Sequence, residues 1–186
     1  MRTIMVTSAG PAEGKSTTVS NLAVVMAQQG KHVLLIDADM RKPTAHYTFR
    51  QTNTRGLTNV LTRQIALQDA IAKTEVDRLD ILTSGPVPPN PSEQLASRMM
   101  EQLIQEANQE YDVVLFDCPP LLAVTDAQIL ANRCHGVVLV VNSGKTETEA
   151  AIKAKEMLVN AKAKLLGVVL NGKKMKQGQY YYYYGS

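Results

Sequence analysis

A strand, a glycine-containing loop and a helix follow one another at the start of the chain, and this order constrains the fold most. Residues 3–7, Thr-Ile-Met-Val-Thr, predict a buried strand, and helical periodicity runs from about Ser16 to Gln29. Between them, residues 9–16 read Ala-Gly-Pro-Ala-Glu-Gly-Lys-Ser, the relaxed [AG]-x4-G-K-[ST] form of a P-loop. In such a loop, backbone N–H groups and the helix N-terminus form an anion cradle. The segment therefore predicts a nucleotide-binding α/β fold.

The rest of the chain repeats this alternation of strand and helix. Short apolar runs predict further strands at residues 32–36, 79–82, 113–116, 136–141 and 165–170. Segments with helical periodicity separate the later strands, at about residues 92–109, 126–133 and 147–163. Near-continuous apolar strands joined by helices are typical of a parallel sheet that is covered by helices on both faces. We expect residues 1–172 to form one such domain.

The loop predicts the residues that contact ATP. Lys15 is expected at the β- and γ-phosphates, the Ser16 hydroxyl on Mg²⁺, and Thr17 at the α-phosphate. Asn171 follows the last predicted strand, and its amide matches the adenine edge as well as it matches a turn with Gly172; both readings stay open. The predicted ATP-binding residues are Gly10, Pro11, Ala12, Glu13, Gly14, Lys15, Ser16, Thr17 and Asn171.

Aspartates follow two other predicted strands at the point where each ends. Asp37 comes directly after one apolar run, with Asp39 two residues further on, and Asp117 comes after another. Ligands of open parallel sheets bind outside the carboxyl ends of the strands, so these acids are expected to converge on the phosphates. Carboxylates there hold Mg²⁺ or accept a proton from a nucleophile. We therefore predict Lys15, Asp37, Asp39 and Asp117 as catalytic, and Ser16 with the three aspartates as metal ligands.

The last fourteen residues differ in composition from the rest. Residues 173–186 are polar, basic and glycine-containing, and they include five of the seven tyrosines of the chain. These five are consecutive: Tyr180, Tyr181, Tyr182, Tyr183 and Tyr184. Such a segment has little apolar surface to bury, so we expect a flexible tail.

Composition excludes several other classes of protein. A net charge of +3 is too small to indicate nucleic acid as a partner. Cys118 and Cys134 have no metal-ligand spacing and are expected to be reduced, buried residues of a cytoplasmic protein. The sequence has neither a signal peptide nor an apolar run of the roughly 20 residues that a membrane span needs. Any association with a membrane is therefore expected to depend on a partner.

Three motifs together resemble the bacterial tyrosine kinases known as BY-kinases. The P-loop, the segment LLIDADMRKP at residues 34–43 and the segment VVLFDCPP at residues 113–120 resemble the Walker A, Walker A′ and Walker B motifs of that family. The resemblance continues through HYTFRQTNTRGLTNVLT, AVTDAQILAN and GVVLVVNSGKT, and so covers nearly the whole chain. The Gram-positive split form, in which the kinase and its membrane adaptor are separate proteins, is the most similar.

The resemblance implies a function and partners. It implies a kinase that uses ATP and Mg²⁺ and phosphorylates the Tyr180–Tyr184 cluster in trans within an oligomer. It further implies a transmembrane adaptor that recruits the kinase to the inner face of the membrane, a phosphotyrosine phosphatase, and sugar-nucleotide enzymes of polysaccharide synthesis as substrates. Arg41 is a candidate for supplying positive charge, within the site or across a subunit contact. The assembly motif of the family, E-x2-R-x2-R, is not found in this sequence, so no oligomer number is implied.

The same P-loop fold also serves ParA- and MinD-like positioning ATPases. Those proteins usually carry a second lysine five residues before the P-loop lysine, and this position is Gly10 here. A MinD-like protein would also end in a basic amphipathic helix, which a run of tyrosines does not form. A third reading is a regulatory module that binds ATP without catalysis, and the complete set of Asp37, Asp39 and Asp117 argues against it.

Overall fold

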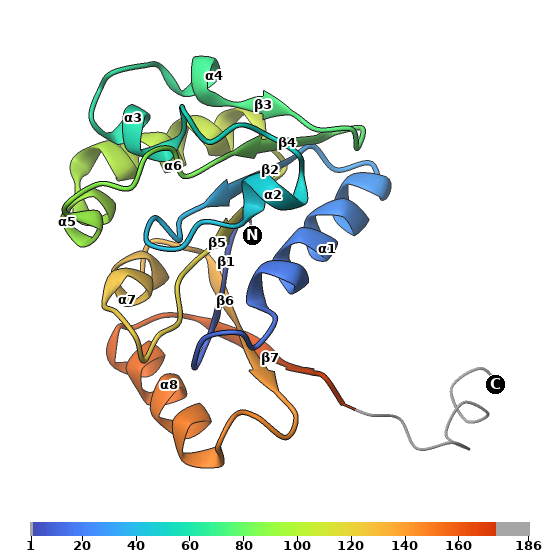
Figure 1. Ribbon diagram of the computed structural model, residues 1–186, viewed down its shortest axis with the longest axis vertical. Helices are drawn as coiled ribbons and strands as arrows, with labels where there is room; N and C mark the ends of the chain where they lie inside the picture. The colour runs from blue at the N-terminus through green and yellow to red at the C-terminus, as the bar shows by residue number, and fades with distance from the viewer. Residues whose placement is uncertain (1, 174–186) are drawn as a thin grey trace, which may run out of the picture.

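The computed structural model describes residues 2–173, which fold around one mostly parallel sheet (Figure 1). The strands are β1 Thr3–Ser8, β2 Val33–Asp37, β3 Ala72–Lys73, β4 Leu79–Leu82, β5 Val113–Asp117, β6 Gly136–Asn142 and β7 Leu165–Asn171. The helices are α1 Lys15–Gln28, α2 Ala45–Thr48, α3 Leu57–Leu61, α4 Leu67–Ala70, α5 Pro91–Ala96, α6 Arg98–Glu110, α7 Asp126–Ala131 and α8 Thr148–Asn160. The predicted class, α/β with helices on both faces of a parallel sheet, is confirmed.

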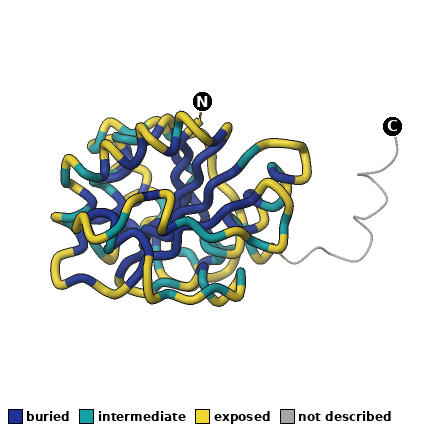
Figure 2. Tube along the Cα trace, turned by 90° about the horizontal axis from the view of Figure 1, so that it is seen from above, coloured by how far each residue is buried: buried dark blue, intermediate teal, exposed yellow. Residues whose placement is uncertain are grey.

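The strand order is β3-β4-β2-β5-β1-β6-β7, and only the short β3 runs antiparallel to its neighbour. The three strands that precede the predicted site residues, β1, β2 and β5, are adjacent in the centre of the sheet. All of their residues are buried, as their continuous apolar sequences predict (Figure 2). The carboxyl ends of these strands therefore bring the P-loop and the aspartates to one edge.

The two faces of the sheet have separate cores. Helix α1 covers one face and packs through small or β-branched residues, Val19, Ala23 and Ala27, which recur every fourth residue. Helices α3, α5, α6, α7 and α8 lie on the other face (Figure 1). On α6, Met100, Leu103, Ile104 and Ala107 are buried, the i, i+3, i+4, i+7 pattern of an amphipathic helix.

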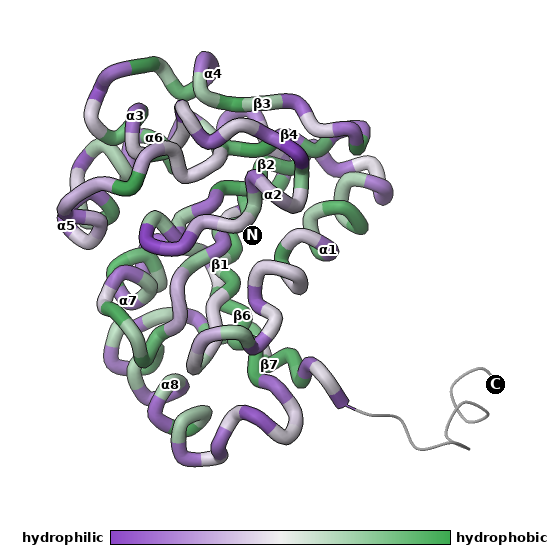
Figure 3. Tube along the Cα trace, in the orientation of Figure 1, coloured by the Kyte–Doolittle hydropathy of each residue, from purple (hydrophilic) through white to green (hydrophobic). Residues whose placement is uncertain are grey.

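Strand β7 differs from the central strands because it lies at the edge of the sheet. Most of its residues are exposed although they are aliphatic; Val168 is 55% and Leu170 is 54% exposed (Figure 3). Helix α8 packs through Ala154 and Leu158 against the core on this side and leaves much of β7 uncovered. The last residue of β7, Asn171, lies at the carboxyl edge of the sheet, beside the P-loop.

Several expected elements differ in detail. The helix expected at residues 92–109 is two helices, α5 and α6, because Ser97 adopts an extended conformation and its hydroxyl caps α6 by accepting the N–H of Met100 at 3.3 Å. Asp37, Asp117 and Asn171 are the last residues of β2, β5 and β7, as expected from their positions at the ends of apolar runs. Cys118 and Cys134 are buried and free, as expected.

Among residues 2–173, no helix combines the length and the apolar character that a membrane crossing requires. The predicted tail from residue 174 onward lies outside the described residues. The same is true of the five predicted autophosphorylation sites, which are Tyr180, Tyr181, Tyr182, Tyr183 and Tyr184. Their assignment stays a prediction from the sequence.

Candidate active site

The P-loop joins the end of β1 to the start of α1. At two of its residues the backbone has a conformation that L-amino acids rarely adopt. Ala12 has φ 55° and Gly14 has φ 92°, both in the left-handed region. A Cβ at Gly14 would also lie 1.9 Å from Nδ2 of Asn171, so the side chain of Asn171 would have to move. The glycine that the motif requires at this position is thus explained by conformation and by space.

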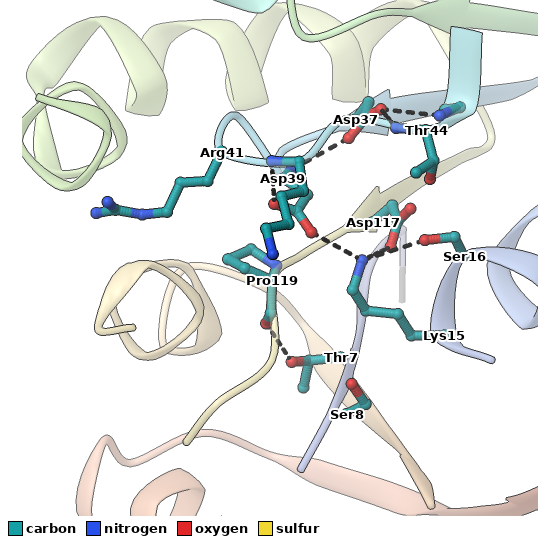
Figure 4. A network of polar contacts seen from close by, with 12 residues as sticks. Thr7, Ser8, Lys15, Ser16, Asp37, Asp39, Arg41, Thr44, Asp117 and Pro119 are labelled. Carbon is teal, nitrogen blue, oxygen red and sulfur yellow. Dashed lines mark hydrogen bonds and ion pairs between the residues drawn. The ribbon is translucent and has the colours of Figure 1, made fainter. Parts of the chain in front are cut away.

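Lys15 and two aspartates form the centre of the site (Figure 4). The Lys15 ammonium lies 3.0 Å from Oδ1 of Asp117 and 3.1 Å from Oδ2 of Asp39, and it donates to the Ser16 hydroxyl at 3.1 Å. The three charged groups come from α1, from the end of β5 and from the loop after β2. The structure therefore brings together four of the predicted site residues, which are up to 102 positions apart in sequence.

Asp37 lies behind this cluster and contacts backbone rather than the cavity. It is paired in register with Asp117 on the neighbouring strand and is fully buried. Its Oδ2 accepts the N–H groups of Thr44 and Ala45, each at 3.0 Å, and its Oδ1 accepts that of Asp39 at 3.2 Å. Asp37 thus holds the loop that carries Asp39.

Burial and mutual repulsion set the protonation of these groups. Burial, and then the neighbouring Asp117 carboxylate, raises the pKa of Asp37 to about 7, although a hydrogen bond from Ala45 opposes this. Burial also raises the pKa of Asp117, against the attraction of Lys15. For Lys15, burial lowers the pKa, but the carboxylates of Asp117 and Asp39 outweigh it and the pKa is raised. Lys15 therefore stays a cation at neutral pH.

The donor set fits a divalent cation bound together with phosphates. The carboxylates of Asp39 and Asp117 face one ammonium, and Oδ2 of Asp117 is buried without a hydrogen-bond partner among the described residues. Within residues 2–173, no three acidic, histidine or cysteine side chains form a ready-made metal cluster. Proteins usually bind Mg²⁺ through one or two carboxylates plus substrate phosphates and water, and two carboxylates lie together here. Ser16 and Asp117 would hold the cation, and Asp39 lies beside them.

A cavity of about 390 Å³ opens beside this cluster, at the P-loop. Of the predicted residues, Pro11, Ala12, Gly14, Lys15, Ser16, Thr17 and Asp39 line it. Lys42, Thr44, Thr48 and Pro120 complete the lining and were not predicted. Lys42 could have been predicted from the sequence, because it is a cationic residue three positions after Asp39 in the segment DADMRKP, close to an expected anion site.

Arg41 lies outside this cavity. Its side chain points away from Lys15 and Asp117 (Figure 4). Its guanidinium pairs with the buried carboxylate of Asp126 at 2.9 Å and reaches the hydroxyl of Ser92 at 3.3 Å. Arg41 therefore does not supply positive charge within the site in this conformation. It connects the loop after β2 to α5 and α7 instead. The sequence offered one signal for this contact, the isolated acidic residue Asp126 in the segment TDAQ. In the structure Asp126 is completely buried.

Asn171 contacts the P-loop rather than an open pocket. Its Nδ2 donates to the carbonyl oxygen of Glu13 at 3.1 Å. Of the two readings left open by the sequence, a base contact or a turn, neither describes this bond. Sequence reasoning also missed Lys145 and Thr146, which contact Ala12 and Glu13 from the loop after β6.

Comparison with known proteins gives close relatives. Residues 1–150 match the family model described as an AAA domain. The tyrosine-protein kinase YwqD of Bacillus subtilis is 57% identical over 186 residues, which is 100% of this chain and 78% of that protein. The putative tyrosine-protein kinase CapB of Staphylococcus aureus is 42% identical over 186 residues, covering 100% of this chain and 82% of CapB.

Solved structures agree in fold. The kinase domain of the Escherichia coli tyrosine kinase ETK matches with a TM-score of 0.91 at 36% identity, covering 95% of this chain and 69% of the other. The septum site-determining protein MinD of Pyrococcus horikoshii, solved with Mg-ADP, matches with a TM-score of 0.77 at 26% identity, covering 91% and 69%. The kinase domain is therefore nearer than the MinD protein in both fold and sequence. By its similarity to YwqD and CapB along its whole length, this chain belongs to the bacterial tyrosine-protein kinases.

Proposed function

We propose that this chain transfers the γ-phosphoryl group of ATP to protein tyrosines. The observation that carries the proposal is the cluster of Lys15, Asp39 and Asp117 beside the cavity at the P-loop, in a chain 57% identical to a tyrosine-protein kinase. A P-loop alone supports nucleotide binding in many folds. The acids beside it supply what a phosphoryl transfer to a hydroxyl needs in addition: a place for a cation and a group that accepts the proton.

The transfer has one bond made and one broken. The phenolic oxygen attacks the γ-phosphorus while the bond from this phosphorus to the β–γ bridging oxygen breaks, and ADP leaves. Bound Mg²⁺ would neutralise charge on the phosphate oxygens. Lys15 is released from Asp39 and Asp117 to contact the β- and γ-phosphates, and the P-loop N–H groups hold the remaining oxygens.

Asp39 is the better candidate for the group that accepts the phenolic proton. A free tyrosine has a pKa of about 10, so a nearby base is needed at neutral pH. Asp39 lines the cavity; its Oδ1 accepts the N–H of Lys42, but its Oδ2 contacts only the Lys15 ammonium, which turns to the phosphates. Both oxygens of Asp37 are held by backbone N–H groups. Asp37 then acts through the loop that it holds, and Asp117 supports the cation.

The substrates and partners follow from the family and from the tail. We propose that the tyrosines at 180–184 of one copy are phosphorylated by another, and that cellular proteins, including sugar-nucleotide enzymes of capsule or exopolysaccharide synthesis, are further substrates. A membrane adaptor would recruit and activate this cytoplasmic kinase, and a phosphotyrosine phosphatase would reverse the modification. Each phosphate adds roughly −1.5 to −2 charges, so the basic tail becomes anionic.

The test is an anti-phosphotyrosine assay with Mg-ATP, with and without the cytoplasmic segment of the adaptor. Wild type is compared with Lys15→Met and with a variant in which Tyr180–Tyr184 are all changed to Phe. We expect phosphotyrosine on wild type alone. ATP hydrolysis without phosphotyrosine, with the adaptor segment present, would instead support the ParA/MinD-like ATPase that shares the fold.

A further inference from the structure

The residue between the two left-handed positions of the P-loop is a buried glutamate. Glu13 is 4% exposed, with Ala12 at φ 55° before it and Gly14 at φ 92° after it. The left-handed conformation is unfavourable for alanine, and strained backbone persists only where its surroundings hold it. A carboxylate beside a phosphate site is also unfavourable by charge. Both features call for a structural reason.

The carboxylate of Glu13 links the P-loop to the loop after β6. Its Oε2 accepts the N–H of Gly10 at 3.0 Å, within the P-loop. Its Oε1 accepts a hydrogen bond from the hydroxyl of Thr146, whose oxygen in turn accepts the N–H of Asn142 at 2.8 Å. Glu13 and Thr146 are 133 residues apart in sequence, so this contact joins two loops that only the fold brings together.

Two further bonds hold the backbone carbonyls on either side of this contact. The ammonium of Lys145 donates to the carbonyl oxygen of Ala12 at 3.1 Å, and Nδ2 of Asn171 donates to that of Glu13 at 3.1 Å. In a trans peptide the C=O and N–H groups point in opposite directions. Fixing these two carbonyls therefore also fixes the direction of the next two N–H groups, those of Glu13 and Gly14. Such N–H groups form the cradle that binds phosphate.

We propose that Glu13 and Thr146 form a clasp that positions the P-loop for the phosphates of the nucleotide. Glu13 is a positioning residue, because it acts through the backbone of the cradle. The loop of residues 142–146 then belongs to the nucleotide site although it does not line the cavity of about 390 Å³. The inference rests on the proposed use of ATP and adds to it the part of the protein that keeps the cradle formed.

The test measures the affinity of the purified full chain for Mg-ADP by calorimetry. Glu13→Ala and Thr146→Val each remove one side of the clasp, and each is expected to weaken binding about tenfold, the loss of about one hydrogen bond to a charged group. The double variant is expected to bind about as weakly as Glu13→Ala alone, because Thr146→Val removes a contact that Glu13→Ala has already broken. Glu13→Gln and Thr146→Ser retain groups that can hydrogen-bond, and both are expected to bind within about threefold of wild type.

Thr148→Val is the matched control, because Thr148 is exposed and lies two residues from Thr146. The melting temperature of the nucleotide-free protein separates positioning from general destabilisation, which would lower it without weakening Mg-ADP binding by the folded protein. If Glu13→Ala fails to fold, Thr146→Val alone still tests the contact, because it removes the contact from the other side. Wild-type affinity in Thr146→Val, or additive losses in the double variant, would overturn the clasp. A wild-type chain that does not bind Mg-ADP would overturn the proposed function, and the clasp with it.

Discussion

At the scale of single residues, the three aspartates of the site differ in what surrounds them. Asp39 lines the cavity and pairs with Lys15, Asp37 is enclosed by backbone N–H groups, and Asp117 keeps one buried oxygen without a partner among the described residues. Asp37 and Asp39 cannot be distinguished from the sequence alone, because both follow the same apolar run. Only the direction of each side chain separates a group that meets the substrate from one that holds a loop.

Replacing Asp39 is expected to affect catalysis more than nucleotide binding. Asp39→Asn removes the carboxylate that faces the cavity, and a positioned base typically contributes about 10²–10⁴-fold to the rate. We therefore expect kcat for tyrosine phosphorylation to fall by at least about 100-fold while the Kd for ADP changes by less than about fivefold. Equal losses in both quantities would indicate that Asp39 serves binding instead.

The raised pKa of Asp37 predicts how stability depends on pH without nucleotide. Its pKa is about 7 in the folded chain and 3.8 as the ordinary value, so between these pH values the folded state binds a proton that the unfolded state has released. The contribution of Asp37 to stability therefore falls as pH rises from about 4 to about 7, and is constant above. Asp37→Asn should remove this dependence.

The measurement is the melting temperature of both proteins at about pH 5 and about pH 8, on either side of the folded-state pKa. The melting temperature of wild type minus that of Asp37→Asn should be roughly 5 °C lower at the higher pH than at the lower pH. A difference that is the same at both pH values would show that Asp37 is ionised throughout. Because both proteins share all other titrating groups, the comparison reports this carboxyl together with its repulsion of Asp117.

At the scale of elements, long regular segments were predicted well and short ones were not. Continuous apolar runs located β1, β2, β4, β5, β6 and β7, and the motif located the loop between β1 and α1. Helices α2, α3 and α4 have four or five residues each, too few to show a helical period, and β3 has two. The contact of Glu13 with Thr146 gave no sequence signal, because it depends on β6 lying beside β1 in the sheet.

The P-loop is expected to tolerate no side chain at Gly14. Gly14→Ala adds a Cβ at 1.9 Å from Nδ2 of Asn171 and places an L-residue at φ 92°. Strain of this kind costs about 1–3 kcal/mol, so Mg-ADP binding should weaken at least about fivefold in calorimetry. Adding Asn171→Ala relieves the contact but not the backbone strain. Full recovery in the double variant would therefore contradict the role given to the backbone conformation.

The two outer strands on the α8 side should respond differently to mutation. Leu139 on β6 and Val168 on β7 are register partners on one face, yet Leu139 is 1% and Val168 is 55% exposed. Leu139→Ala is expected to lower the unfolding free energy by about 2–5 kcal/mol, as in other cores, and Val168→Thr by less than about 1 kcal/mol. Urea denaturation of both variants checks this, and a comparable loss for Val168→Thr would mean that β7 is covered in solution.

At the scale of the whole molecule, a catalytic domain and a proposed substrate segment belong to one chain. The fold places Lys15, Asp39 and Asp117 at the carboxyl edge of the sheet, and β7 ends at the same edge, two residues before the last described residue. The tyrosines follow from there in sequence. The fold class was predictable from the alternation of apolar strands and helices, and most site residues were predictable because they lie at or just after the end of an apolar strand. How two copies meet cannot be predicted from a sequence pattern or from the structure of one domain.

Transfer between copies is the central claim, and a mixing experiment tests it most directly. The active chain with Tyr180–Tyr184 changed to Phe is incubated with Lys15→Met and Mg-ATP, and phosphotyrosine on the Lys15→Met chain is measured by mass spectrometry. Lys15→Met cannot label itself, so we expect phosphate on its residues 180–184. No label on that chain, under conditions in which wild type alone becomes labelled, would contradict transfer between copies.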